Sequence, residues 1–166
     1  MAKFEIFRIS RRIDEQLPQN LIRKVFFLPK KNPHYLILVI RSQGGDLGHA
    51  AHFVSLLNEL KRRGTKVITI AYDFVSSAAL PIFAAGDIRM TKSEREIFFF
   101  HRAEKTATVS FDELLGSENS AFKYMSNRFA LSLEELYKIA NEEKRIGASY
   151  AKDLGIVHKI LEKTVV

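Results

Sequence analysis

The fold is decided by one stretch of the chain, Tyr72-Asp73-Phe74-Val75-Ser76-Ser77-Ala78-Ala79-Leu80-Pro81-Ile82-Phe83-Ala84-Ala85-Gly86-Asp87. The apolar, β-branched run that leads into it, Val67–Tyr72, predicts a buried strand. The small residues after the two serines predict a buried helix that ends at Gly86. A hydroxyl at this junction could attack a carbonyl if a base is near, because the unpaired N–H groups of the helix start would stabilise the oxyanion. The alternative is that Ser76 or Ser77 simply caps the helix.

The length and composition predict a globular protein. The chain has 166 residues, 46% of them hydrophobic, so we expect residues 1–166 to form a single domain with a sizeable core. The absence of cysteine excludes disulfides, zinc thiolates and a cysteine nucleophile. The first residues lack the apolar core of a signal peptide, and no apolar run approaches the ~20 residues of a membrane helix. We therefore expect a soluble, cytoplasmic protein without membrane contact.

The formal net charge of the chain is +7. The basic residues occur in short, separate groups: Arg11-Arg12, Lys30-Lys31, Lys61-Arg62-Arg63 and Lys144-Arg145. No group is interleaved with aromatic residues in the manner of a single-stranded nucleic-acid site. We therefore expect the charge to solvate the surface, and nucleic-acid binding is a minor alternative.

Strands and helices are predicted to alternate in the first half of the chain. Strands are expected at Phe4–Ile9, Tyr35–Ile40 and Val67–Tyr72, with an amphipathic helix after each of the first two. The run Tyr35–Ile40 is apolar throughout, which predicts a central parallel strand covered on both faces. Gly44-Gly45 follows it, then Asp46, which can cap the next helix. The pattern is a parallel β-α-β-α-β-α arrangement, and ligands of such sheets bind at the strands' carboxyl ends, where the glycines and serines both lie.

The second half is predicted to continue the α/β pattern and to place a histidine near the serines. Strands are expected at Ile88–Met90 and Glu96–Phe100, and His101 follows the second. A lone histidine there is more commonly structural, but this one also lies at a strand's carboxyl end. The remaining elements expected are a helix over Phe111–Phe129 capped by Ser110, a helix that the capping box Ser132-Leu133-Glu134-Glu135 opens, a helix over Ala148–Leu154, and a closing strand over Ile156–Leu161.

Four segments, in their order and spacing, resemble the ClpP family of serine peptidases. They are Ile13-Asp14-Glu15 with Phe26-Phe27-Leu28, Ile40-Arg41-Ser42-Gln43-Gly44-Gly45, Ser77-Ala78-Ala79 with Ala85-Gly86, and Ala148-Ser149-Tyr150-Ala151 with Gly155-Ile156-Val157. They are similar to the family's first helix, its strand ending in Ser-Pro-Gly-Gly, its nucleophile helix and its Gly-Leu-Val ending. The resemblance covers Phe4 to Leu161. It implies an α/β fold of the ClpP/crotonase group, with repeated β-α-β units and a short helical handle segment.

The resemblance also implies a set of catalytic residues. Counting back from Gly86 puts the family's nucleophile on Ser77, and its histidine falls on His101. The family's aspartate, twelve positions before the glycine of Gly-Leu-Val, falls on Glu143, and a glutamate can orient and stabilise the imidazole as an aspartate does. The oxyanion hole would be formed by the backbone N–H groups of Gly44 and Ala78, with Gly45 as the fallback if the register is off by one.

This chain departs from the family pattern at several of these positions. Gln43 replaces a proline, and Ala78-Ala79 replaces Met-Gly. Pro81 lies within the nucleophile helix, where it would leave the Ser77 carbonyl without its helical partner. The stretch after His101 is short for the family, and Lys105–Val109 is all that remains of the handle, which in these peptidases joins rings and binds extended peptide.

The function that the resemblance implies is a serine-type endopeptidase that cleaves peptides or unfolded proteins through an acyl-enzyme, without metal or organic cofactor. A partner ATPase that unfolds substrates is part of the family's activity. Two other classes stay open. One is a catalytically silent assembly or binding subunit, which Pro81 and Glu143 favour. The other is a crotonase-type acyl-CoA enzyme, which Ser77 and His101 disfavour.

We also expect a homo-oligomer. Apolar residues span more than one face of two predicted helices, and 13 phenylalanines are many for one small core. A closed ring is the expected assembly, and the short segment after His101 favours a single ring, or a double ring joined differently, over the family's usual stacked form.

Overall fold

The computed structural model describes residues 2–27, 32–92, 96–103 and 111–161, apart from the side chains of Glu96 and residues 111–115. In chain order the elements are β1 (Phe4–Ile9), α1 (Gln16–Leu21), η1 (Ile22–Phe26, π-helical), β2 (Tyr35–Ser42), α2 (Leu47–Arg62), β3 (Lys66–Ser76), α3 (Ala79–Ala84), β4 (Ile88–Thr91), β5 (Glu96–Phe99), α4 (Phe111–Ser126), α5 (Leu133–Asn141), β6 (Arg145–Gly147), α6 (Ala148–Asp153) and β7 (Lys159–Ile160).

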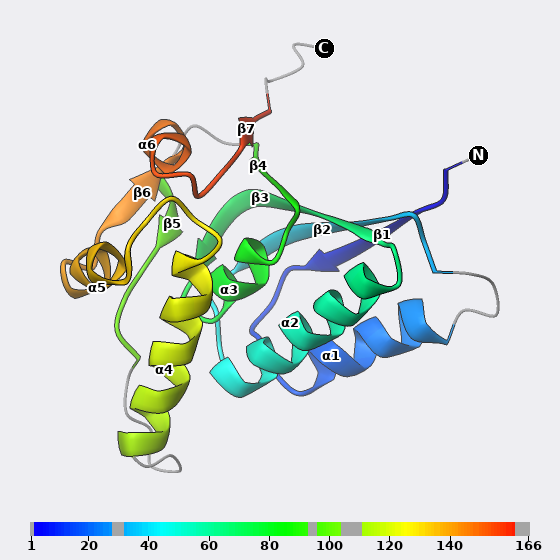
Figure 1. The fold of residues 1–166 in the computed structure, drawn as a ribbon, viewed down its shortest axis with the longest axis horizontal. Helices are drawn as coiled ribbons and strands as arrows, with labels where there is room; N and C mark the ends of the chain where they lie inside the picture. Colours follow the sequence, from blue (N-terminus) through cyan, green and yellow to red (C-terminus); the bar gives the residue numbers. More distant parts are fainter. Residues whose placement is uncertain (1, 28–31, 93–95, 104–110, 162–166) are drawn as a thin grey trace.

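The sheet is built around β3, and this strand is what brings the two halves of the chain together. Strands β1, β2, β3, β4 and β7 lie side by side in that order, all parallel. The first part of β3 pairs with β4, while its last residues, Val75 and Ser76, pair with Phe98 and Phe99 of β5. Strand β5 in turn pairs with β6 in antiparallel orientation. The end of β3 therefore lies beside the end of β5 (Figure 1).

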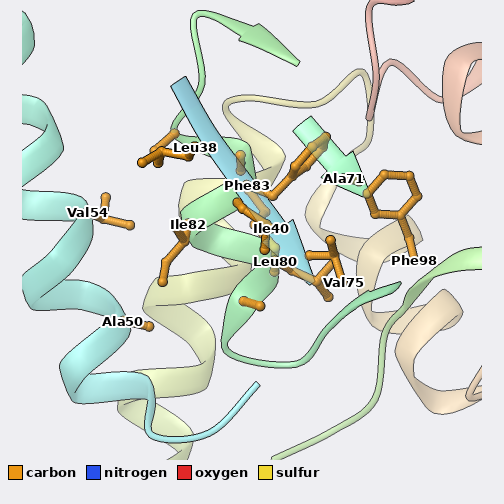
Figure 2. Packing of buried hydrophobic residues seen from close by; sticks show 14 of the residues in the cluster. Leu38, Ile40, Ala50, Val54, Ala71, Val75, Leu80, Ile82, Phe83 and Phe98 are labelled. Carbon is orange, nitrogen blue, oxygen red and sulfur yellow. The ribbon is translucent and has the colours of Figure 1, made fainter. Parts of the chain in front are cut away.

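The helices predicted from local signals are confirmed. Asp46 caps α2 through a hydrogen bond from the His49 N–H (2.8 Å), and Ser132 and Glu135 form the expected capping box at α5. Helix α3 is shorter than predicted and ends at Ala84, two residues before Gly86. Its six residues are all buried. Figure 2 shows Leu80, Ile82 and Phe83 of α3 among buried side chains of α2, β2, β3 and β5.

Three boundaries differ from the sequence prediction because of strand pairing. Strand β3 runs on to Ser76 instead of ending at Tyr72, since β5 offers it a partner there. The short strand β6 was not predicted, because three residues that pair with β5 leave no periodic pattern. The closing strand is limited to the two residues of β7 that pair with β4. The predicted Ser110 cap lies outside the described residues.

In the described part of the chain the two faces of β2 are not equally buried, which corrects the prediction that Tyr35–Ile40 is covered on both faces. Leu36, Leu38 and Ile40 of β2 are fully buried, whereas Ile37 and Val39, which point the other way, are only partly buried. Their in-register neighbours on adjacent strands share this pattern. The result is a partly exposed apolar surface, called here the open sheet face, made of Phe4, Ile6, Tyr35, Ile37, Val39, Ile68, Ile70, Ile88 and Met90. A strand with two apolar faces has the same sequence pattern whether helices of the same chain cover both faces or only one.

A buried arginine of β4 bonds to the segment between α6 and β7. Arg89 is 4% exposed, and its guanidinium donates to the carbonyls of Gly86, Arg128, Gly155 and Ile156 over 2.8–3.3 Å. Burial lowers the pKa of Arg89 to about 10. In addition, the Arg89 N–H donates to Nδ1 of His158 (3.0 Å). This network fixes the segment before β7 against the core.

No helix in the described part of the chain combines the length and hydropathy that crossing a membrane requires.

Candidate active site

Ser77 lies at the junction between β3 and α3, in a backbone conformation that side-chain-bearing residues rarely adopt. Its φ is +53°, in the left-handed region. Its N–H donates to the Phe99 carbonyl (3.3 Å), and its carbonyl accepts from the Leu80 N–H (2.9 Å). As expected, Pro81 offers no N–H to the Ser77 carbonyl in the helical pattern, and the Leu80 N–H supplies the donor instead. Non-glycine residues in this region are rare and cluster at functional sites.

The two serines have different surroundings. The Ser76 hydroxyl donates to the Gln43 carbonyl (2.9 Å), and the residue is 8% exposed. Ser77 instead lines an open cleft of about 710 Å³, together with Gly44, Gly45 and His101. Neither serine caps α3, since its N-cap position is Ala78 and has no side-chain cap bond. The alternative that Ser76 or Ser77 caps the helix is therefore wrong.

The glycine turn after β2 packs directly against Ser77. Gly44 has a φ of +97°, and a Cβ placed there would lie 2.6 Å from the Ser77 Cβ and 2.9 Å from the Ala78 nitrogen. Gly45 forms a bridge with Ile13, and a Cβ at Gly45 would overlap the Ile13 carbonyl oxygen. The structure therefore brings Gly44, Gly45, Ser77 and Ala78 together, and only glycine fits the turn.

The backbone N–H groups around Ser77 differ in whether they are already bonded. The Gly44 N–H donates to the buried hydroxyl of Ser42 (3.1 Å), and that hydroxyl donates to the Arg11 carbonyl (2.7 Å). Among the described residues, the N–H groups of Gly45 and Ala78 have no hydrogen-bond partner. Of the two glycines named from the sequence, Gly45 is thus the one with an N–H available to a ligand.

His101 follows β5 and faces the same cleft as Ser77. Both residues line the 710 Å³ cleft and also a small apolar pocket of about 30 Å³ beside it. The imidazole stacks on Phe99 with ring centroids 5.5 Å apart, and its Nδ1 lies 2.7 Å from the Arg102 carbonyl oxygen. Within the described residues no hydrogen bond joins His101 to Ser77.

Glu143 lies in the turn between α5 and β6, before the pairing of β5 with β6 begins. The last pair in that antiparallel register joins Phe99 to Arg145, so His101 and Glu143 both lie beyond it. Glu143 is exposed, with a φ of +48°. Within the described residues it makes no hydrogen bond or ion pair with His101.

Two residues that the sequence analysis did not single out lie next to His101. Glu118 of α4 is 3% exposed and forms a salt bridge with Arg102 (2.8 Å). Glu118 also lines the small pocket with Ser77 and His101. A signal was present in the sequence, since Glu118 shares a helical stripe with Phe122 and Met125, both buried. A charged residue on an apolar stripe is almost never fully buried unless it is paired.

The cleft has a basic rim. Arg11, Arg12 and Arg41 line it on the side of the glycine turn, together with Asp46. Arg41 pairs with Asp73 at 3.1 Å. No group of three or more histidine, aspartate or glutamate side chains in the described ranges is arranged to hold a metal ion.

These features define the class of the protein. The sheet consists of parallel β-α-β units. A serine in the left-handed region follows β3, and the glycine turn that follows the neighbouring strand β2 packs against it. This arrangement is the ClpP/crotonase fold. The sequence profile of the family described as Clp protease matches residues 1–164, and the chain belongs to this family.

One solved structure illustrates the similarity in fold. The crystal structure of the ClpP protease catalytic domain from Plasmodium falciparum superimposes with a TM-score of 0.84 and 22% sequence identity, covering 97% of this chain and 86% of the other. A comparison with curated proteins gave no match. The predicted fold class is thus confirmed.

Proposed function

We propose that the protein is a serine endopeptidase in which Ser77 is the nucleophile and His101 the general base. The observation that carries this is the position of Ser77, held at a φ of +53° in a cleft that His101 also lines. Membership in the Clp protease family supports a peptidase over an acyl-CoA enzyme. In the proposed reaction the Ser77 Oγ attacks the scissile carbonyl while His101 takes its proton, and His101 then returns that proton to the leaving amine. Water hydrolyses the acyl-enzyme.

The oxyanion of the tetrahedral intermediate is proposed to bind at two backbone N–H groups. Ala78 supplies one, directly after the nucleophile. The other is assigned to Gly45, because the Gly44 N–H is already bonded to Ser42. Gly44 keeps an essential part, since the absence of its side chain lets the turn approach Ser77. Donors fixed in this way stabilise the developing charge without reorganising.

Glu143 is proposed as the third residue of the triad. Its support is that the antiparallel pairing of Phe99 with Arg145, if continued by two residues, would bring Glu143 toward His101. A carboxylate there would stabilise the imidazolium that forms when His101 accepts the serine proton.

A serine-reactive fluorophosphonate probe tests the proposal. The purified protein is incubated with the probe, and the adduct is located by mass spectrometry. We expect the adduct on Ser77, with labelling and peptide hydrolysis abolished in Ser77→Ala. Ser76→Ala is the matched control, because its hydroxyl bonds to Gln43 and should leave labelling largely intact. An adduct on Ser76, or equal labelling of Ser77→Ala, would contradict the assignment.

The second candidate function is a catalytically silent assembly subunit. It is favoured by the lack of side-chain hydrogen bonds that join Ser77, His101 and Glu143 within the described residues. The same probe separates the two functions, since a silent subunit would be folded and assembled but unlabelled.

We propose that the protein assembles as a ring of identical copies and takes peptides or unfolded proteins as substrates, with an unfolding ATPase as its partner. The open sheet face supports the assembly, because Phe4 is 61% and Ile6 45% exposed on a contiguous apolar surface. The short segment after His101 supports a single ring, although Lys105–Val109 lies outside the described residues.

Light scattering tests the assembly. A mass near 19 kDa would show a monomer and contradict the ring, and a mass of fourteen subunits would contradict the single ring. Ile6→Glu should dissociate the assembly, because it places a charge on the open sheet face. Phe27→Glu is the control, since Phe27 follows η1, lies off the sheet and is 75% exposed.

A further inference from the structure

A buried carboxylate lies next to the proposed general base, and the proposed reaction does not use it. Glu118 of α4 is 3% exposed. It accepts hydrogen bonds from Nε of Arg102 to both of its oxygens (3.0 Å each), from Nη2 of Arg102 (2.8 Å) and from the Ala103 N–H (2.6 Å). One side chain thus fixes two consecutive residues that directly follow His101.

The Arg102 side chain is held on its other sides as well. Its Nη1 donates to the Asn141 Oδ1 (3.1 Å), and its guanidinium lies 4.9 Å from the ring centroid of Tyr137. The hydrogen bonds that Arg102 donates to Glu118 raise the pKa of Arg102, so the cation is retained. Helices α4 and α5 are therefore both attached to the segment after β5 through this one arginine.

The carbonyl of the same arginine contacts the imidazole. The Arg102 carbonyl oxygen lies 2.7 Å from the Nδ1 of His101, which is a hydrogen bond if Nδ1 carries the proton. In that tautomer Nε2 is unprotonated, and an unprotonated Nε2 is the form that a general base needs. The acid of a catalytic triad has two roles: it orients the imidazole, and it stabilises the charged form of the imidazole. The Arg102 carbonyl can perform only the first role.

A structural role in stability alone is a poor explanation of such a pair. The Glu118 side chain is 4% exposed whereas that of Arg102 is 42% exposed, and burying a carboxylate costs desolvation free energy that its pairing does not always repay. The pair also lies where geometry matters for the reaction, since Glu118 lines the small pocket together with Ser77 and His101.

We infer that Glu118 is a positioning residue for His101. Through Arg102 and Ala103 it fixes the backbone so that the Arg102 carbonyl accepts from Nδ1–H and leaves Nε2 free to take the proton of Ser77. The second role, stabilisation of the imidazolium, is left to Glu143, which is exposed. This inference rests on the proposed function, because it assigns Glu118 a part in the use of His101 as a base.

Two measurements on the full chain test the inference. The first is nitrogen NMR of the protein with ¹⁵N-labelled histidine, in which the two ring nitrogens of each tautomer give distinct shifts. The His101 signals are assigned by their loss in His101→Gln. The second is the rate of fluorophosphonate labelling as a function of probe concentration, which separates the maximal rate from the half-saturating concentration.

The variants are Glu118→Gln and, as a matched control, Glu59→Gln. Glu59 also pairs with arginines, Arg62 and Arg63, but on the surface of α2 away from the cleft. In the wild type we expect the tautomer with the proton on Nδ1. In Glu118→Gln we expect this signature to be lost and the maximal labelling rate to fall about 10²-fold, the scale of a small misplacement of a catalytic group, at an unchanged half-saturating concentration. The control should change neither.

Arg102→Lys keeps the inference testable if Glu118→Gln fails to fold. The lysine retains a positive charge for the buried carboxylate, but it cannot bond to Glu118 in the bidentate manner and to Asn141 at once. We expect it to fold and to lose the Nδ1 signature. A wild-type protein with the proton on Nε2, or a folded Glu118→Gln protein with wild-type tautomer and labelling rate, would overturn the inference. A wild type that shows the Nδ1 signature but never labels would refute the proposed function and leave the positioning of His101 standing.

Discussion

Replacing Gly44 by alanine tests whether the glycine turn shapes the surroundings of Ser77. The change has two costs that the structure separates. First, Gly44 has a φ of +97°, and an L-residue in the left-handed region costs about 1–2 kcal/mol. Second, the new Cβ would lie 2.6 Å from the Ser77 Cβ, 2.8 Å from the Ser76 carbonyl oxygen and 2.9 Å from the Ala78 nitrogen. Overpacking of this kind adds about 1–3 kcal/mol.

Gly64 provides the matched control for the first cost. Its φ is +90°, nearly that of Gly44, and a Cβ there would meet nothing within 4 Å. Gly64→Ala should therefore lose about 1–2 kcal/mol, and Gly44→Ala about 2–5 kcal/mol. At about 2–4 °C per kcal/mol for a chain of this size, the losses in melting temperature are ~2–8 °C and ~4–20 °C.

The assay combines thermal unfolding with fluorophosphonate labelling below the melting transition. Gly44→Ala must displace Ser77 or Ala78, and a displacement near 1 Å costs about 10²-fold in rate. Gly64→Ala should label at the wild-type rate. If Gly44→Ala loses no more stability than Gly64→Ala and labels at the wild-type rate, the glycine turn does not pack against Ser77 as described.

Two further predictions concern titratable groups. Glu143→Gln should keep the fold and slow the labelling of Ser77. The loss in labelling rate should be smaller than the about 10⁴-fold seen when a triad loses both the correct tautomer and the negative charge, because the Arg102 carbonyl still orients His101. A full loss of about 10⁴-fold would assign both roles to Glu143. Burial, and then the charges of Arg89 and Arg128, lower the pKa of His158, whose Nδ1 accepts the Arg89 N–H. The unfolded chain therefore binds the proton more readily, so stability is complete above the unfolded pKa near 6.5 and is lost as the pH falls below it. His158→Asn, whose amide oxygen can accept the same N–H, should flatten the fall in unfolding free energy between about pH 7 and 5 measured by urea titration; an unchanged slope would contradict the assignment.

Some elements of the site were predictable because their causes are local in sequence. Asp46 precedes an amphipathic stripe and caps α2, and Ser132 with Glu135 forms the box that opens α5. Two serines between a β-branched run and a run of small residues mark a strand-to-helix junction. Spacing to Gly86 singled out Ser77, and the structure places Ser77 in the cleft and the Ser76 hydroxyl on Gln43. Whether Ser77 is the nucleophile stays a prediction.

Other features could not be predicted because they depend on which chain segments meet. The Ser77 carbonyl, which lacks its helical partner because of Pro81, accepts from the Leu80 N–H. The apolar run of β2 is the same whether its second face is covered by its own helices or left for another chain. Which of two adjacent glycines has an unbonded N–H depends on the side chain of Ser42, which donates to Arg11 and so accepts from Gly44.

By itself, the sequence determined the α/β pattern and the helix starts, since these follow from short-range periodicity and capping chemistry, and its resemblance to the ClpP family made Ser77, His101 and Glu143 candidates. Only the tertiary structure decided how those residues are supported. The pairing of β5 with β6 joins the segments that precede His101 and follow Glu143, and α4 brings the buried Glu118, 15 residues beyond Ala103 in the chain, to the backbone that follows His101. Hydrogen bonds between distant segments leave no periodic trace in a sequence, because their geometry exists only once the chain has packed.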